Sequence, residues 1–103
     1  MKRDKGVNLT MYYRTSTIVQ MKSDSLDGLV KTLLEINRKG EMRDFLYGIL
    51  TPYELQEIPR RLEIVKLLKH GVSQHKIAHD LGVGVATVTR GSKEIQKGRF
   101  KNV

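Results

Sequence analysis

The sequence predicts an all-α protein of about six short helices, and two observations support this fold class. Apolar residues recur at spacings of three and four along most of the chain after residue 25, as they do on one face of a helix. Residues 73–93, SQHKIAHDLGVGVATVTRGSK, have the pattern of two helices joined by a glycine turn. At 103 residues the chain is long enough for one domain with a modest core.

The composition excludes several classes of protein. The sequence contains no cysteine, so it has neither a disulfide framework nor a thiolate metal site. No apolar run approaches the roughly 18 residues that span a bilayer, and the amino end lacks the apolar stretch of a secretory signal. We therefore expect a cytoplasmic protein with no membrane partner. No nucleophile, base and orienting group cluster in the sequence, so we do not expect an enzyme.

The chain is expected to contain a flexible or partner-ordered arm (residues 1–22), a helical domain (residues 23–98) and a basic C-terminal tail (residues 99–103). The first helix is expected over residues 25–39, because Ser23, Asp24 and Ser25 offer N-caps and Gly40 is placed to end it. A shorter helix is expected over residues 41–50. Its apolar face consists of Met42, Phe45, Leu46 and Ile49.

Thr51, Pro52 and Glu54 form a start signal for the next helix. Threonine can cap the helix, proline fits its first turn, and glutamate can bond back to the cap amide. Pro59 lacks an amide proton and disfavours helical conformation at the residue before it. We therefore expect a break just before Pro59 and a new helix that continues to about residue 69. Its buried residues are expected to be Leu62, Ile64 or Val65, and Leu68.

The stretch 73–93 predicts a helix-turn-helix. Ser73 can cap a helix over residues 74–81, Gly82 lies where a positive φ is needed, and a second helix follows over residues 85–96. The small Ala78 lies where the two helices would cross most closely. The residues expected to pack between the helices are Ile77, Leu81, Val83 and Val88.

Positive charge coincides with this motif. The whole chain has a net charge of +8 and a pI near 9.9. Residues 60–103 contain ten Lys or Arg and three Asp or Glu, a net charge of +7. The first 59 residues contain nine Lys or Arg and eight Asp or Glu, a net charge of +1. A net charge of this size also serves solubility. Its position on a helix-turn-helix favours a polyanion, and hence double-stranded DNA, as the partner.

The second motif helix has small and hydroxyl side chains that suit base edges in the major groove. Threonine methyl groups can contact thymine, and the hydroxyl groups can bond bases or ordered water. Polar residues at the start of the first motif helix, together with helix amides, are expected to hold phosphate oxygens. Lys76 and Lys97 would add charge without specificity. The predicted DNA-binding residues are Ser73, Gln74, His75, His79, Gly84, Val85, Ala86, Thr87, Thr89 and Lys93.

His75 and His79 lie four residues apart, a spacing that can also chelate a metal ion. However, Lys76 occupies the place of the glutamate in H-E-x-x-H, and the sequence offers no third ligand. We therefore expect no metal. Contact with phosphate, stronger when the imidazoles are protonated, fits these residues better.

Four segments together resemble the trp repressor family of tryptophan-dependent helix-turn-helix repressors. They are LTPYE at 50–54, RRLEIVKLL at 60–68, SQHKIAHDLG at 73–82 and GVATVTRGS at 84–92. The resemblance implies an intertwined homodimer whose two recognition helices enter successive major grooves of a palindromic operator, about 34 Å apart.

The resemblance also implies a corepressor pocket for L-tryptophan or a related small molecule. Arg90 would hold the ligand carboxylate, and Arg61 would flank the aromatic ring. Carried over by position, the pocket residues are Leu50, Thr51, Arg61, Ile64, Arg90 and Gly91. The sequence departs from the family pattern at Glu94, where well-known members have serine, and at Gly48, which replaces an apolar pocket residue.

Other interpretations of these features stay open. Arg61 and Arg90 could pair with carboxylates such as Glu57, Glu63 or Glu94 in structural bridges, and Glu94 could close the pocket by neutralising Arg90. The protein could also be a ligand-independent regulator of the same family or a general nucleic-acid binder. A further alternative is a protein-interaction module in which the helix-turn-helix serves only as scaffold.

Overall fold

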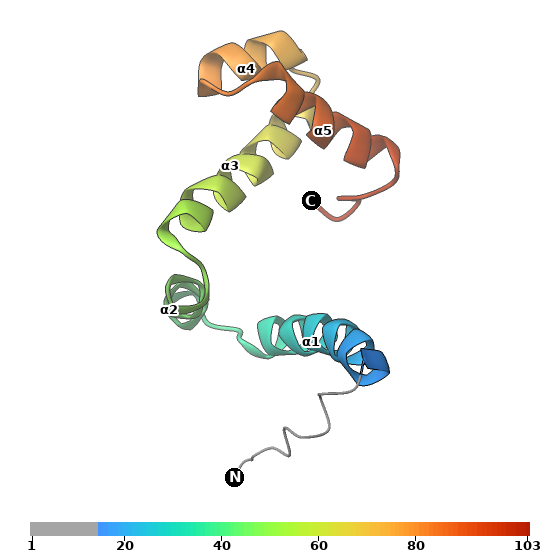
Figure 1. Ribbon diagram of the computed structural model, residues 1–103. Coiled ribbons are helices and arrows are strands. Elements are labelled where there is room, and N and C mark those ends of the chain that lie inside the picture. Colours follow the sequence, from blue (N-terminus) through green and yellow to red (C-terminus); the bar gives the residue numbers. More distant parts are fainter. Residues whose placement is uncertain (1–14) are drawn as a thin grey trace. The chain divides into compact units, whose positions relative to one another are not determined.

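The computed structural model describes the backbone of residues 15–103 and the side chains of residues 24–103, and within these residues the regular secondary structure consists of helices alone (Figure 1). This confirms the predicted all-α class, with five helices in place of about six. They are α1 (Thr15–Glu35), α2 (Lys39–Ile49), α3 (Pro52–Lys69), α4 (Gln74–Leu81) and α5 (Val85–Gln96). The chain divides into two compact units, Met1–Phe45 and Leu46–Val103.

Helix α1 begins at Thr15, before the predicted start at residue 25, and ends at Glu35, before the predicted end at residue 39. Residues 15–22, assigned to the arm from the sequence, are therefore helical, and residues 1–14 lie outside the described residues. Asp24 and Ser25 are exposed within α1, where water solvates side chains that would otherwise cap a helix. Gly40 does not end α1 but lies in the first turn of α2.

Helix α3 runs without interruption through Pro59, so the predicted break was wrong. Proline removes one helical hydrogen bond, but its fixed φ near −65° is itself helical. Burial of Ile64 and Val65 on the following turn favours continuation of the helix. Leu62 is 43% exposed, so its predicted burial was also wrong, whereas Leu68 is partly buried.

The start of α3 confirms the predicted capping box. The Thr51 amide donates to Glu54 Oε1 at 2.9 Å, and the Glu54 amide donates to Thr51 Oγ1 at 3.2 Å. Pro52 occupies the first helical turn. Hydrogen bonding of the Glu54 carboxylate, first to the Thr51 backbone and second to the Thr51 side chain, lowers the pKa of Glu54 from its ordinary value.

In the Leu46–Val103 unit, helices α3, α4 and α5 pack on one another. Four buried residues form the core where they meet: Ile64, Ile77, Ala78 and Val88. Ile77 and Val88 are 0% exposed, as the helix-turn-helix pattern predicted. The partly buried hydrophobic residues around this core are Leu67, Leu68, Val72, Leu81 and Val83.

The predicted glycine turn between α4 and α5 is present. Gly82 has φ 66°, in the left-handed region where a side chain would be strained. The Gly82 amide donates to the His79 carbonyl at 3.3 Å, and the Val83 amide donates to the Ala78 carbonyl at 3.0 Å. These two hydrogen bonds end α4 and direct the chain so that Val83 packs against the core.

Candidate nucleic-acid interface

Helix α5 has one buried face and one exposed face. Val88 is fully buried, and Gly91 lies so close to α3 that an added Cβ would approach Ile64 Cγ2 at 3.4 Å. A shallow hollow runs along the opposite face. Its lining residues are Val85, Ala86, Thr89, Arg90, Lys93, Glu94 and Lys97. The helix is therefore fixed by one side and presents the other to solvent, which is the arrangement a major-groove reader needs.

The N-terminus of α5 is open. Gly84 is its N-cap, with extended backbone and no side-chain hydrogen bond to the first amides. Val85 is 39% exposed, and Ala86 is also exposed. Amides at an uncapped helix start attract anions, so a phosphate group fits here. At the start of α4, in contrast, Ser73 Oγ accepts the Lys76 amide at 3.2 Å, which confirms Ser73 as a helix cap.

Two of the predicted DNA-binding residues bond to each other. Thr89 Oγ1 donates to Gln74 Oε1 at 2.6 Å in a partly buried contact between α5 and α4. This bond joins the two motif helices in addition to their buried contacts. The Thr89 hydroxyl and the Gln74 amide oxygen therefore have a structural partner within the chain.

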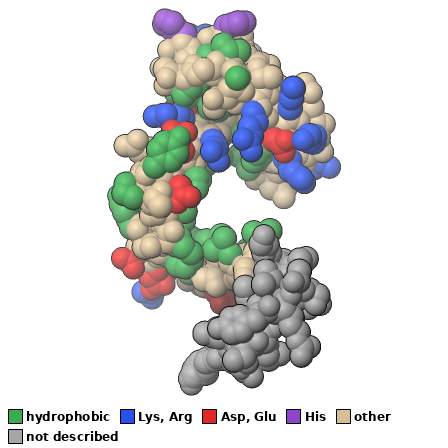
Figure 2. Space-filling model, viewed as in Figure 1, with side chains coloured by type: hydrophobic (Ala, Val, Ile, Leu, Met, Phe, Trp, Pro, Cys, Tyr) green, Lys and Arg blue, Asp and Glu red, His purple; other side chains and the backbone are tan. Residues whose placement is uncertain are grey.

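The basic side chains of the motif differ in their pairing. Lys76 lies 3.1 Å from Asp80, and Lys97 lies 3.0 Å from Glu94. Lys93 has no ion pair within the described part of the chain. Figure 2 shows Lys and Arg side chains gathered on one face of this unit. The charge of Lys93 is therefore more available to a phosphate group than that of Lys76 or Lys97.

Figure 2 shows histidine side chains at one end of this unit, and Figure 1 shows that α4 lies at the same end. His75 is exposed, and His79 is 89% exposed with Nδ1 3.2 Å from Asp80 Oδ1. The hydrogen bond from His79, followed by that from Lys76, lowers the pKa of Asp80. Within residues 24–103, no three side chains gather that could hold a metal ion.

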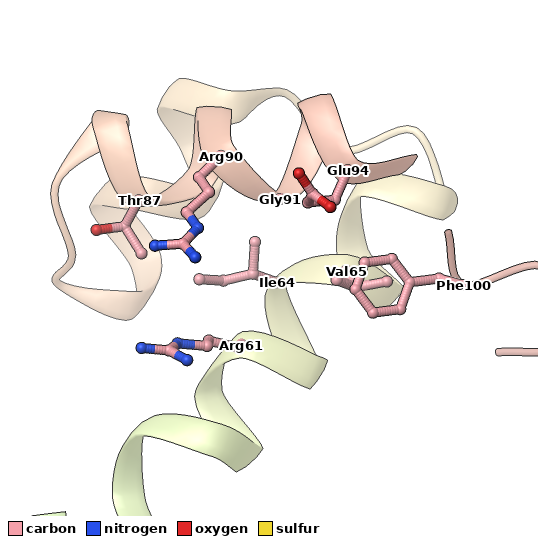
Figure 3. Close-up of a pocket in the computed structure, with 8 residues that line it drawn as sticks. All are labelled: Arg61, Ile64, Val65, Thr87, Arg90, Gly91, Glu94 and Phe100. Atoms are coloured by element: carbon pink, nitrogen blue, oxygen red, sulfur yellow. The ribbon is translucent and has the colours of Figure 1, made fainter. Parts of the chain in front are cut away.

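A pocket of about 240 Å³ lies between α3 and α5 (Figure 3). It brings together four of the residues expected to bind a corepressor: Arg61, Ile64, Arg90 and Gly91. Leu50 and Thr51 do not line it. Thr51 lies at the start of α3, ten residues before Arg61, which corresponds to about 15 Å along the helix.

The charges around the pocket are unevenly paired. Glu94 is bonded by Lys97 Nζ at 3.0 Å and lies 3.7 Å from Arg99 Nε. The hydrogen bond from Lys97, together with the charges of Lys97, Arg99 and Arg90, holds the pKa of Glu94 below its ordinary value. Arg61 and Arg90 have no ion pair with any residue that the structure describes. The two guanidinium groups are therefore available to an anion.

Four further residues line this pocket in addition to the four that were expected to bind a corepressor: Val65, Thr87, Glu94 and Phe100. Thr87 was expected to contact DNA, whereas Val65 and Phe100 were given no role in a site. Phe100 is the last aromatic residue of the chain and follows Gly98 by two positions. Only that isolated aromatic residue, in an otherwise polar tail, could have drawn attention to it.

These features define a helix-turn-helix domain with a basic, solvent-facing second helix, the class of protein that binds DNA. The family model described as Trp repressor protein matches residues 24–102. The chain therefore belongs to the Trp repressor family of DNA-binding transcription regulators.

The chain is similar to proteins from three bacteria, two of which are named Trp operon repressor homologs. The Trp operon repressor homolog of Vibrio campbellii is 43% identical over 61 residues, 58% of this chain and 59% of that protein. The homolog of Actinobacillus succinogenes is 33% identical over 79 residues, 76% of this chain and 78% of that protein. "Uncharacterized protein YerC" of Bacillus subtilis is 30% identical over 73 residues, 71% of this chain and 70% of that protein. No solved structure matches. None of the described helices is long and apolar enough to cross a membrane.

Proposed function

We propose that the protein is a sequence-specific transcriptional repressor that binds DNA as a homodimer and reads the major groove with α5. The observation that carries this proposal is the two-sided geometry of α5. Val88 and Gly91 face the core, while Val85, Ala86 and Lys93 face solvent. Family membership supports the same proposal.

Dimerisation is supported by apolar side chains of α1 that are not buried within the single chain. Among residues 24–45 none is buried. Leu26 is 61% exposed and Leu34 is 79% exposed in the single chain. A second copy of the chain would cover such helices and supply the two-fold symmetry of a palindromic operator. Sedimentation should give a dimer for the native chain and a monomer for Leu34→Glu, while the exposed Lys31→Glu should remain a dimer.

Sequence specificity is tested by selecting duplexes from a random pool and measuring their affinity at fixed salt. We expect a two-fold symmetric site bound at least about a thousandfold more tightly than random duplex. Val85→Ala should relax the preference at particular positions, whereas Lys93→Ala should weaken all duplexes alike. Equal affinity for selected and random duplexes would instead identify a general nucleic-acid binder.

We further propose that the pocket between α3 and α5 takes a small carboxylate, of which L-tryptophan is the first to test as a corepressor. Support comes from the guanidinium groups of Arg61 and Arg90, which line the pocket together with the apolar side chain of Ile64 (Figure 3). Leu50 and Thr51 lie away from this pocket in the single chain, so their participation requires a second copy.

Calorimetry with L-tryptophan tests the ligand. Heat that saturates with the native chain and disappears in Arg90→Ala, but persists in Arg43→Ala on α2, is the expected result. Absence of heat and of any thermal shift at millimolar ligand would identify a ligand-independent member of the family.

A further inference from the structure

The segment after α5 folds back onto α3. Gly98 has φ 93°, its amide donates to the Ile95 carbonyl at 2.9 Å, and the Arg99 amide donates to the Glu94 carbonyl at 3.1 Å. This bond pattern reverses the chain at the helix end. The predicted basic tail is therefore an ordered segment, residues 98–103, with defined contacts.

Lys69 of α3 holds this segment. Its Nζ donates to the Phe100 carbonyl at 2.7 Å and to a backbone oxygen of Val103 at 2.5 Å. Besides the bond between Thr89 and Gln74, these are the side-chain hydrogen bonds that join distant parts of the described chain. The ammonium group thus ties the segment that leaves α5 to the last turn of α3.

The Phe100 ring lines one end of the pocket, and the residue is 37% exposed. Figure 3 shows it beside Val65 and on the far side of Ile64 from the two guanidinium groups. Val65 is only 3% exposed although it is not a member of the core cluster, so residues outside that cluster cover its side chain. Phe100 has φ 63°, a left-handed conformation that a bulky residue keeps only where its contacts outweigh the strain.

We propose that residues 98–103 act as an intramolecular strap that closes the α3–α5 pocket with Phe100 and holds α5 in position without a bound small molecule. This inference rests on the proposed function only for the role of α5 on DNA. Arg61 and Arg90, at the other end of the pocket, remain available to a small anion. A ligand with a larger aromatic body has to displace the Phe100 ring.

Hydrogen–deuterium exchange of the full chain, without ligand or DNA, tests the strap. Phe100→Ala removes the ring, and Lys69→Met removes the ammonium group while keeping most of its apolar stem. Each should accelerate exchange of the α5 amides about fivefold, because α5 opens more often when the strap is lost. The matched controls are Val103→Ala in the same segment and Lys66→Met on the same helix, and neither should change the rate.

Unchanged α5 exchange in Phe100→Ala and Lys69→Met would overturn the strap, and so would equal acceleration in all four variants. The readout does not depend on DNA or corepressor. If the native chain binds no duplex, the proposed function is wrong, but the exchange rates of the α5 amides still show whether the strap holds α5. A second measurement adds L-tryptophan to native protein and to Phe100→Ala. Tighter binding by the variant supports displacement of the ring, and tighter binding by the native chain contradicts it.

Discussion

Replacement of Lys93 by alanine gives the most direct test of the proposed interface. Lys93 lies on the exposed face of α5 and lines the same hollow as Val85, Ala86 and Arg90. Its ammonium group has no ion pair with any described residue, in contrast to that of Lys97. Removal of Lys93 therefore deletes one available charge without releasing a carboxylate that would repel DNA.

The size of the effect follows from counterion release. Each phosphate contact contributes about 0.9 to the slope of log affinity against log salt. At about 0.15 M salt, one contact is then worth roughly fivefold in affinity. A dimer presents Lys93 twice, so Lys93→Ala should weaken binding about thirtyfold and make the slope shallower by about 1.8.

Fluorescence anisotropy of a labelled duplex, titrated at four or more salt concentrations, measures both quantities. Selected and random duplexes should lose affinity by the same factor, because phosphate contacts carry no sequence information. Lys39→Ala, which removes an equal charge at the start of α2, is the control and should leave the slope unchanged. A native slope retained in Lys93→Ala would refute the placement of this side chain on the DNA backbone.

Three further predictions concern stability. Ile77→Ala should cost about 2–5 kcal/mol of the free energy of unfolding, measured in urea, because Ile77 is 0% exposed at the centre of the core. Thr51→Ala should cost about 1 kcal/mol through loss of the helix cap, and Thr51→Ser should restore most of it. The folded-state pKa values of Glu54, Asp80 and Glu94 are lowered, so their stabilisation is present above their unfolded pKa values and is lost as pH falls through the folded ones. Tm should therefore decrease as pH falls below about 4.5, and a Tm independent of acid pH would contradict these three hydrogen-bonded carboxylates.

Local signals predicted the helix-turn-helix well because its determinants lie close together in the sequence. The cap at Ser73, the turn at Gly82 and the burial of Ile77 and Val88 each depend on neighbours within one or two turns. Side-chain caps and left-handed glycines act over three to five residues, so the pattern contains them in full. The same holds for the capping box at Thr51.

Features that depend on distant partners were not predictable in this way. The continuity of α3 through Pro59 depends on burial of Ile64 against α4 and α5, which outweighs a local preference. The role of Phe100 depends on Lys69, 31 residues away. Only some of the residues that line the pocket could be predicted from the sequence. Resemblance indicated Arg61 and Arg90, but only the folded chain brings the Phe100 ring to the same cavity.

The small core explains why such distant contacts matter to function. Four buried residues hold three helices together in the unit that would read DNA. A core of this size supplies little free energy beyond the cost of ordering the chain. Each added tie, such as the bond from Thr89 to Gln74 and the two bonds from Lys69, is therefore a large share of what fixes α5. Because groove recognition requires a fixed helix, the affinity for DNA should depend on these ties as strongly as on the residues that touch the bases.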